Sequence, residues 1–403
     1  MGTLTVPLME CEDAAWFRDS ESLAAAARSG ARSLAQRAAL LPERVAEVAL
    51  AVSEAATNLR RHAKDGSLLL RVVRTDSEAA LECVTLDHGP GMPDIARALT
   101  DGVSSGGTLG IGLGAISRLA DTFDVHSLPG RGTVMTARFW NRTPGGRLAA
   151  AGGEAVVTGI TRPMSGQELC GDAWAARTLP SSHPPAPVPS RPYRSPGTLD
   201  WSVLTGTAGR PGPTRSDRWA PVPAGASTAP PPEESGAFLV MFCDGLGHGP
   251  LAAKAALDAV AAFRHTTATT PDGVLADIHH ALRSGRGGAV AVGLVEPAER
   301  RVGVCGVGNI STFTVDPATG ARRSLPSAPG IVGHQLPALR TVRQQLAPGS
   351  AVVMHSDGLT DRWQAAALPG MCAQLPVTAA ALLLREAGVR RDDAGVLVAK
   401  GLW

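Results

Sequence analysis

Aromatic residues are scarce in this chain: they make up 4% of its 403 residues and include a single tyrosine. Its six cysteines are scattered and none forms a C-x-x-C pair, which fits a reduced compartment better than a disulfide framework. Long apolar runs are absent too, since the longest, near 237–243, is far too short to span a bilayer. Because acidic residues stand where a secretion signal would be basic, the sequence predicts a cytoplasmic protein without a membrane partner.

An excess of charge of one sign is also missing. The formal net charge is +2 and no long basic block occurs, which argues against nucleic acid as the main partner. Apolar residues, by contrast, make up 44% of the chain, and most of them are small. A chain of this length and composition has room for two or three domains with cores of layered helix and sheet.

Helical and strand-like patterns alternate over the first 140 residues. The second of two predicted helices has an apolar stripe and begins after Pro42, a residue that suits the first turn of a helix. This order of elements predicts an α/β sandwich, which we assign to residues 1–143. The predicted elements are two helices within 14–63, strands at 67–74 and 81–86, a glycine-rich stretch with its own helix, and a hairpin of 123–126 with 133–139.

Short apolar runs that end in turn residues fill the rest of the chain, with helical segments between them. They predict a second, sheet-rich α/β domain over 152–403. Within it the composition changes sharply between 176 and 235, where nearly half of the chain's 31 prolines stand among Ser, Gly, Thr and Arg. Such a stretch buries too little apolar surface to offset the cost of ordering it, so we predict a disordered insertion there.

Two polar residues stand on the face of the second helix opposite its apolar stripe. Glu54 and Asn58 are four residues apart and therefore share that face. The plain interpretation is a solvated polar face. In the functional interpretation Asn58 offers Mg²⁺ a carbonyl oxygen, and Glu54 orients or deprotonates the group that attacks a γ-phosphate.

Glycine-rich turns follow in three places. The stretch "LDHGPGMPDI" is either a simple turn or a site where Asp87 accepts a hydrogen bond from a purine amine while Gly89 and Gly91 let the ring lie close. The stretch "GGTLGIGLG", residues 106–114, is either a flexible loop or a phosphate cradle at a helix N-terminus. The stretch "GRGT" ends in Thr133, whose hydroxyl is expected to support the aspartate.

In this order the motifs E-x-x-x-N, D-x-G-x-G, G-x-G-x-G before a helix, and G-T resemble those of the GHKL ATPase/kinase family. The stretch from "GPGMPDI" to "TFDVHS" resembles the switch-protein serine kinases of its anti-sigma-factor branch. The resemblance covers about residues 1–140 and implies a domain that binds MgATP and phosphorylates a serine of a small antagonist protein. It implies Glu54 as the catalytic residue, Asn58 as the Mg²⁺ ligand, and Asn58, Asp87, Gly89, Gly91, Gly107, Gly110, Gly112 and Thr133 as the ATP-binding residues.

Two other interpretations of this domain remain open. A histidine kinase has the same motifs but needs a phosphoacceptor histidine on an upstream helical hairpin, and no histidine precedes Glu54. The domain is alternatively a non-catalytic module that binds a sigma factor or another regulator, with ATP tuning its shape. Loss of partner binding on mutation of Glu54 would argue against the second of these.

Aspartates stand where apolar runs of the second region stop. They are Asp172 in "CGDAW", Asp244 in "FCDGLGHG", Asp357 in "HSDGLTD", and Asp392 with Asp393 in "RRDDAG". Any one Asp-Gly after a strand is more often a turn than a ligand. Several carboxylates at neighbouring strand ends repel one another, however, unless a positive charge neutralises them. A pair of divalent cations would do so and would activate water against a phosphoryl group without a side-chain nucleophile.

This arrangement resembles the SpoIIE-like branch of the metal-dependent type 2C serine/threonine phosphatases, over residues 152–403. The resemblance implies an α-β-β-α sandwich that uses Mn²⁺ or Mg²⁺, with Asp393 supporting the ligands. His248 is either a donor to substrate or water or an ordinary loop histidine. "GVGNIS", residues 306–311, is predicted to be a structural turn without chemistry. The implied metal ligands are Asp172, Asp244, the backbone carbonyl of Gly245, Asp357 and Asp392.

Two features depart from that family's pattern. About seventy residues separate Asp172 from Asp244, where the family has a short hairpin, so the proline-rich stretch is an insertion inside the phosphatase domain. Cys170 also stands where a glycine is expected. The second departure weakens Asp172 as a ligand. A degenerate phosphatase half that serves as a scaffold is a further interpretation that stays open.

Together the two resemblances imply a bifunctional regulator of sigma-factor activity in a partner-switching pathway. Its kinase and phosphatase would act on serine or threonine of STAS-type antagonist proteins. The other partners considered are a sigma factor, a second phosphatase and a second copy of the chain.

Overall fold

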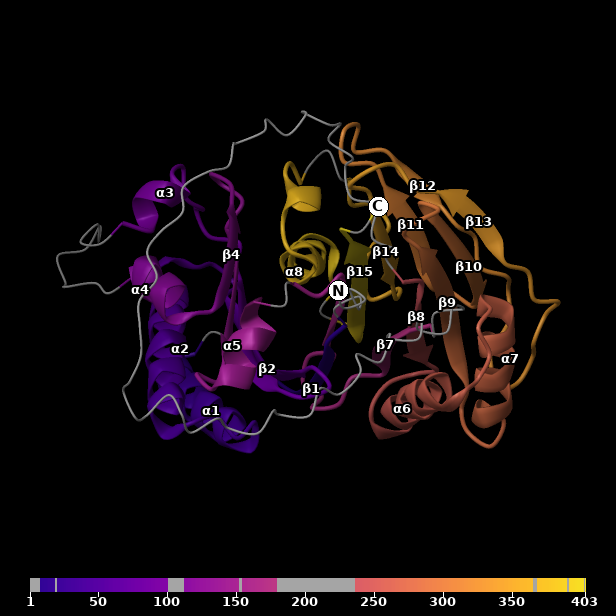
Figure 1. The fold of residues 1–403 in the computed structure, drawn as a ribbon, viewed down its shortest axis with the longest axis horizontal. Coiled ribbons are helices and arrows are strands. Elements are labelled where there is room, and N and C mark those ends of the chain that lie inside the picture. The colour runs from indigo at the N-terminus through magenta and orange to yellow at the C-terminus, as the bar shows by residue number, and fades with distance from the viewer. Residues whose placement is uncertain are drawn as a thin grey trace, which may run out of the picture. The chain divides into compact units, whose positions relative to one another are not determined.

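The computed structural model describes residues 8–18, 20–100, 112–151, 154–179, 236–364, 368–389, 391–401 and 403. They form three five-stranded antiparallel sheets with helices against them (Figure 1), so the predicted α/β fold class is confirmed. The proline-rich insertion lies almost wholly outside the described residues, and the chain on both sides of it belongs to one structural unit. None of the described helices is long and apolar enough to cross a membrane.

The first sheet has the strand order β1-β2-β3-β5-β4. Helices α1 and α2 cover one face, where alanines, valines and leucines of both helices pack on Leu68, Leu70 and Cys83 of the sheet. Alternate residues of the same strands, such as Leu69 and Val84, point to the other face, as strand geometry requires. The elements are β1 (Glu10–Arg18), α1 (Leu23–Arg37), α2 (Pro42–His62), β2 (Ser67–Arg74), β3 (Ala79–Leu86), α3 (Ile95–Ala98), α4 (Gly112–Leu119), β4 (Thr122–Ser127), β5 (Thr133–Trp140) and α5 (Pro144–Ala151).

Strand β1 corrects the prediction of a helix from residue 14. It pairs antiparallel with β2, and the register shifts between Glu12 and Ala15. That irregularity breaks the alternation by which a strand is recognised in a sequence. Phe17 contacts the core under the helices, while Trp16 contacts the core on the opposite face.

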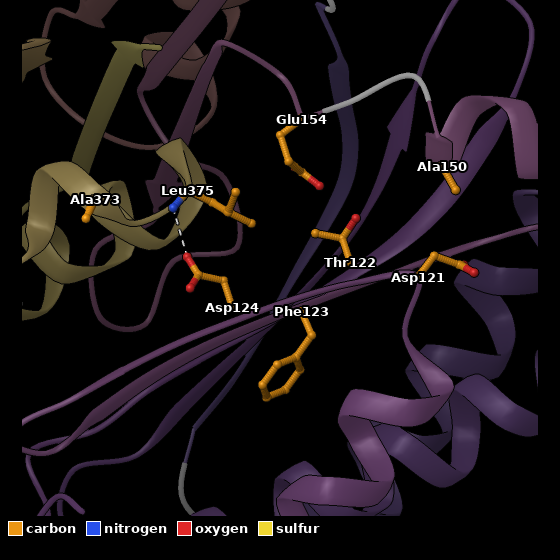
Figure 2. Close-up of a pocket in the computed structure, with 8 residues that line it drawn as sticks. All are labelled: Asp121, Thr122, Phe123, Asp124, Ala150, Glu154, Ala373 and Leu375. Carbon is orange, nitrogen blue, oxygen red and sulfur yellow. Dashed lines mark hydrogen bonds between the residues drawn. The ribbon is translucent and has the colours of Figure 1, made fainter. Parts of the chain in front are cut away.

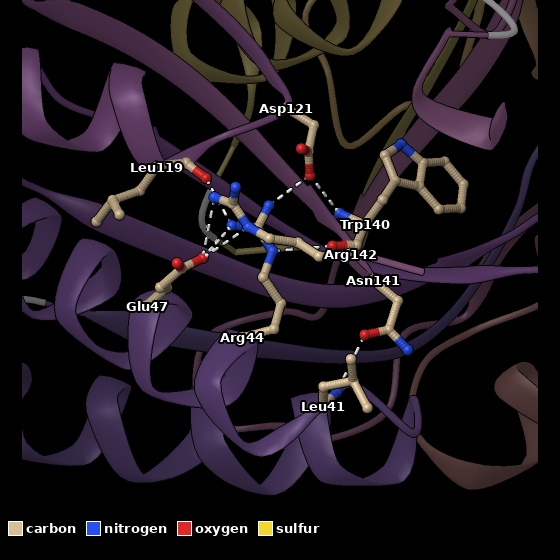
Figure 3. Close-up of polar contacts among 8 residues, drawn as sticks. All are labelled: Leu41, Arg44, Glu47, Leu119, Asp121, Trp140, Asn141 and Arg142. Carbon is tan, nitrogen blue, oxygen red and sulfur yellow. Dashed lines mark hydrogen bonds and ion pairs between the residues drawn. The ribbon is translucent and has the colours of Figure 1, made fainter. Parts of the chain in front are cut away.

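A buried arginine fixes the position of α2 against the sheet (Figure 3). The Arg44 side chain, which is fully buried, donates from Nε to the carbonyl of Trp140 at 2.8 Å and from Nη1 to that of Leu119 at 2.7 Å. It also pairs with Asp121 and with Glu47. A buried guanidinium is stable only when such partners satisfy it, so this network sets the helix that carries Glu54 and Asn58 in one orientation.

The other two sheets stack face to face, with strand orders β13-β10-β9-β8-β7 and β12-β11-β14-β15-β6. Val240 and Phe242 of one sheet meet Val352 and Met354 of the other in the core between them. Helices α6 and α7 cover the outer face of the sheet that contains β8, and α8 covers the outer face of the sheet that contains β15. This arrangement is the predicted α-β-β-α sandwich. The elements are β6 (Val157–Arg162), β7 (Asp172–Thr178), β8 (Phe238–Gly245), α6 (Pro250–His265), α7 (Pro271–Leu282), β9 (Gly288–Glu296), β10 (Arg301–Val307), β11 (Ser311–Val315), β12 (Arg322–Ser324), β13 (Val342–Gln345), β14 (Ala351–His355), η3 (Met371–Ala373), α8 (Pro376–Ala387) and β15 (Ala394–Lys400).

Candidate functional sites

The described residues of the predicted nucleotide site lie on α2, just after β3 and in the turns beside it, and the N–H of His88 after β3 donates to the carbonyl of Lys64 just after α2 at 2.8 Å. Glu54 and Asn58 lie on α2 with intermediate exposure, on the side away from its buried residues. Asp87 directly follows β3 and is 8% exposed. Gly107 and Gly110 lie outside the described residues, and Gly112 begins α4 with a φ of +23°.

Asp87 is held by backbone donors on two sides. Its Oδ1 accepts the N–H of Gly89 at 2.6 Å, and the backbone N–H of Thr133 also donates to the carboxylate. Burial raises the pKa of Asp87, and these two hydrogen bonds oppose that rise. The carboxylate is thus fixed in place and has acceptor capacity left for a donor such as an exocyclic amine.

The Thr133 hydroxyl does not have the role expected of it. It pairs with the Ser127 hydroxyl at 2.9 Å, and the support to Asp87 comes from the Thr133 backbone instead. Ser127 Oγ also accepts the N–H of Met92 at 2.7 Å, so it joins the "GPGM" turn to the "GRGT" turn. Sequence reasoning missed Ser127, which no motif marks.

Two glycines let these turns approach each other closely. Gly91 has a φ of +66°, and a Cβ on it would lie 2.0 Å from the carbonyl oxygen of Leu128. Gly132 has a φ of +78°, and a Cβ there would lie 2.0 Å from the carbonyl oxygen of Asp87. Only glycine fits either position, because both the backbone conformation and the space exclude a side chain.

Replacing Gly132 with alanine is expected to displace Asp87 and to weaken binding of a fluorescent ADP analogue by at least about tenfold, a change of about 1.4 kcal/mol. Backbone strain adds roughly 1–3 kcal/mol of lost stability, measured by urea unfolding. Gly130→Ala is the matched control, since Gly130 has a φ of +75° in the same turn but open space around its Cβ. Equal losses of nucleotide affinity in both variants would show that strain alone, and not contact with Asp87, is responsible.

The candidate metal site lies where β7 and β8 come together. Asp172 and Asp244 are directly opposite each other in this antiparallel pair, although the insertion separates them in sequence. Asp172 is 4% exposed, its Oδ2 accepts the Ser356 hydroxyl at 2.6 Å, and its Oδ1 has no hydrogen-bond partner among the described residues. A buried carboxylate oxygen without a donor is the kind of atom that a cation satisfies.

The remaining aspartates come from the two loops beside this hairpin. Asp357 follows β14 and is exposed, and its Oδ2 accepts the Asn309 amide at 2.7 Å. Asp392 is exposed and Asp393 is buried just before β15. Asp393 accepts the backbone N–H groups of Met164 at 2.7 Å and Gly171 at 2.8 Å, so it fixes the turn that leads into Asp172.

Gly245 ends β8 beside these carboxylates. Its N–H donates to the carbonyl of Gly171 at 2.9 Å, which ties the two ends of the hairpin together. A Cβ on Gly245 would lie 2.2 Å from the carbonyl oxygen of Ala252 in α6, so the helix lies against this turn. His248 is exposed in the loop that follows.

Mutual repulsion and burial dominate the electrostatics of this site. The pKa of Asp244 is raised to about 7, first by burial and then by the charges of Asp357 and Asp392. The pKa of Asp172 is raised well above its ordinary value, first by burial and then by the charge of Asp244. Within the described part of the chain no three His, Cys, Asp or Glu side chains form a ready-made metal cage. The donors nevertheless fit divalent cations, because they are oxygen atoms whose repulsion an ion would relieve.

Two residues of the metal site were missed by sequence reasoning. Asn309 belongs to "GVGNIS", which was predicted to have no chemistry, yet its amide contacts Asp357. Ser356 donates to Asp172 and accepts the N–H of Gly395 at 3.1 Å, so it links both loops to the hairpin. Only the position of Ser356 next to the Asp-Gly pair could have signalled it.

Asp244→Asn is expected to stabilise the metal-free protein above neutral pH. The pKa of this carboxyl is higher in the folded state, at about 7, than its ordinary value of 3.8, so the proton favours folding. Ionisation of Asp244 therefore lowers the free energy of unfolding. This loss is absent below about pH 4, grows as the pH rises towards 7 and is complete above it, and each unit of difference between the two pKa values corresponds to about 1.4 kcal/mol. Thermal unfolding in EDTA at pH 8 should therefore show a higher Tm for Asp244→Asn, and a small or absent difference at pH 4. A lower Tm at pH 8 would contradict this electrostatic account.

Known proteins match both halves of the chain. Residues 17–139 match the family model described as a histidine kinase-like ATPase domain, and residues 234–400 match the model of stage II sporulation protein E (SpoIIE). The serine/threonine-protein kinase RsbT of Bacillus subtilis (strain 168) is 35% identical over 117 residues, which is 29% of this chain and 88% of RsbT. The chain belongs to the RsbT family.

Solved structures with a similar fold include type 2C phosphatases. The PP2C phosphatase domain of SpoIIE from Bacillus subtilis, with a fragment of its regulatory domain, is 11% identical with a TM-score of 0.38, covering 79% of each chain. The serine/threonine phosphatase PstP/Ppp of Mycobacterium tuberculosis is 12% identical with a TM-score of 0.36, covering 60% of this chain and 97% of its own.

This RsbT-family chain therefore joins a GHKL-type domain to a SpoIIE-type phosphatase domain, as the motifs predicted. It is an enzyme of the protein serine/threonine phosphatase class with a domain related to a serine/threonine kinase. ATP is the cofactor that the first domain type implies, and divalent cations are those that the second implies.

Proposed function

We propose that the chain is a bifunctional partner-switching regulator, which both phosphorylates and dephosphorylates serine or threonine of STAS-type anti-sigma antagonist proteins. The observation that carries the proposal is the presence on one chain of two separate sites. One is a backbone-held carboxylate among glycine turns, at Asp87, and the other is a set of repelling carboxylates around the β7–β8 hairpin. Their chemistries are opposite, since one suits a nucleotide and the other suits paired cations.

In the kinase half, Glu54 would take the proton of the attacking serine hydroxyl while Asn58 holds Mg²⁺ and Asp87 holds the purine. In the phosphatase half, Asp172, Asp244, Asp357, Asp392 and the Gly245 carbonyl would hold Mn²⁺ or Mg²⁺. Bound cations supply an activated water and neutralise the phosphoryl charge. Ser356, Asn309 and Asp393 hold the carboxylates and turns in place through the hydrogen bonds described above. The domain limits of 1–143 and 152–403 are part of this proposal.

The test uses two variants of the whole chain with a purified STAS-type antagonist and radiolabelled ATP. Asp244→Ala should accumulate phosphorylated antagonist, because only removal of the phosphoryl group is lost. Glu54→Ala should form none, yet should dephosphorylate antagonist that was phosphorylated beforehand.

If the kinase activity and the phosphatase activity each act on a different partner protein, the proposal of a shared target is wrong. Retained partner binding without any phosphorylation by the wild-type chain would favour the non-catalytic module. An absence of Mn²⁺-dependent hydrolysis of an aryl phosphate would favour the scaffold.

A further inference from the structure

Helix α8 of the phosphatase sandwich lies on the face of the nucleotide domain's sheet that α1 and α2 leave open. Every residue of α8 except Glu386 is buried, and its leucines and alanines share one core with Leu69, Val84 and Leu86 of the first sheet. The hydroxyls of Thr136 on β5 and Thr378 on α8 are 3.0 Å apart within that core. A helix that is apolar all round is expected to be covered on several sides, and α8 is.

The N-terminal end of α8 is anchored to an edge strand. The N–H of Leu375 donates to Asp124 of β4 at 2.8 Å (Figure 2). A cavity of about 420 Å³ opens beside this contact, but its acidic side chains already have partners: Asp121 pairs with Arg44, and Glu154 with Arg138. This end of the helix therefore attaches α8 to β4. The carboxylates of Asp121, Asp124 and Glu154 all have partners already, so none of these three is free to bind a ligand in the cavity.

The C-terminal end of α8 reaches the nucleotide site. The His88 side chain, next to Asp87, lies with its Nε2 3.2 Å from the carbonyl oxygen of Arg385. Glu386 forms an ion pair with Arg131, which stands in the "GRGT" turn that supports Asp87. Both turns that shape the predicted purine pocket thus contact the same turn of a phosphatase helix.

The last residue of α8 and the segment after it form hydrogen bonds with the loop that carries Asp357. The carbonyl of Ala387 accepts the N–H of Thr360 at 2.9 Å, and the N–H of Val389 donates to the carbonyl of Gly358 at 2.7 Å. A Cβ on Gly358 would lie 1.8 Å from the carbonyl oxygen of Asp393, so the two metal-site loops lie in direct contact. A shift of the end of α8 would act on this loop directly through these two backbone hydrogen bonds.

Arg385 is an unusual residue at this junction. It is 4% exposed, and its Nε, Nη1 and Nη2 have no hydrogen-bond partner among the described residues. Its Nη2 lies 3.9 Å from Oε2 of Glu386, Asp87 is the other negative charge acting on it, and Arg131 is the opposing positive one. A buried guanidinium without hydrogen bonds costs stability, which is unexplained if the helix end serves packing alone.

From this chain of contacts we infer that Arg385 and Glu386 are positioning residues of the nucleotide site, and that through them nucleotide and divalent cation bind with mutually dependent affinities. The inference rests on the proposed function, since it requires both ligands. Coupling of this kind is reciprocal: the factor by which one ligand changes the other's affinity is the same in both directions.

The test measures the affinity of the whole chain for a fluorescent ADP analogue under two conditions, in EDTA and at saturating Mn²⁺. Its readout is the ratio of the two dissociation constants. Asp244→Asn removes a ligand of the carboxylate site, so any change in its ratio arises from Mn²⁺ bound to the nucleotide itself. That contribution is subtracted from the wild-type effect. The wild-type ratio should differ from one by at least about fivefold.

Two variants address the helix end. Glu386→Gln removes the ion pairs with Arg131 and Arg385 and keeps the side-chain size, and Arg385→Met removes the buried charge but keeps a shorter, unbranched side chain. Both should bring the ratio close to one while each ligand still binds. Arg385→Met should also unfold at the same temperature as the wild type or higher, because no hydrogen bond to a described residue is lost. The control is Asp258→Asn, which breaks the exposed Lys254–Asp258 pair of α6 and should keep the wild-type ratio.

The outcomes separate the inference from the proposed function. If both ligands bind to the wild type with a ratio of one, or if both variants keep the wild-type ratio, the inference is wrong and the proposed function stands. If the ADP analogue or Mn²⁺ does not bind at all, the proposed function itself fails. A Tm for Arg385→Met well below that of the wild type would show that the charge is structural.

Discussion

Asp244→Asn is expected to lower Mn²⁺-dependent hydrolysis of p-nitrophenyl phosphate by on the order of 10³-fold. Asp244 lies opposite Asp172 across the hairpin and is raised in pKa by its neighbours, so an amide there removes a charge that a cation needs. Metal ions contribute several kcal/mol to such reactions, and each 1.36 kcal/mol corresponds to about tenfold in rate. The initial rate as a function of Mn²⁺ concentration measures the loss.

The same substitution is expected to stabilise the metal-free protein, and this combination is informative. A variant that loses activity by unfolding would show a lower Tm, whereas here activity falls while the Tm at pH 8 rises. Asp258→Asn on α6 is the matched control, since it makes the same chemical change at an exposed carboxylate away from the site. Full activity of Asp244→Asn, or an unchanged requirement for Mn²⁺, would remove Asp244 from the site.

Much of the candidate site could be predicted because its residues are set by periodicity and by strand ends. The spacing of Glu54 and Asn58 puts them on the face of α2 away from the core, and the structure places them there. Asp172 and Asp244 were both predicted where apolar runs stop. Asp244 does lie at the end of β8, but Asp172 begins β7, and antiparallel pairing places that start opposite the end of β8. Their roles as ligands stay a prediction.

What could not be predicted depends on contacts between distant segments. The hydrogen bond of Asn309 to Asp357 joins residues from two loops, and that of Ser356 to Asp172 spans the insertion. The Thr133 hydroxyl was expected to support Asp87 through a hydrogen bond, but it pairs with the Ser127 hydroxyl across the β4–β5 hairpin. The position of α8 against two sheets likewise follows from tertiary packing, and its apolar sequence indicates only that it is buried.

Glu54→Ala is expected to lower phosphoryl transfer from ATP to the antagonist by about 10²–10⁴-fold, the contribution typical of a general base. Binding of ATP should be nearly unchanged, because Asp87 and the glycine turns, which contact the nucleotide in this proposal, are untouched. The loss should therefore appear in kcat and not in the affinity for ATP. Single-turnover transfer of labelled phosphate, together with binding of the ADP analogue, separates the two.

Glu43 provides a matched control for this variant on the same helix. It lies three turns before Glu54 in the first turn of α2, is exposed, and points in nearly the same direction around the helix axis. Glu43→Ala removes a carboxylate at a helix N-terminus, so it should cost about 0.3–1 kcal/mol of stability and leave phosphoryl transfer intact. If Glu54→Ala transfers phosphate as fast as Glu43→Ala does, Glu54 is not the base, and the polar face of α2 is then a solvated surface beside a domain that binds nucleotide without using it for chemistry.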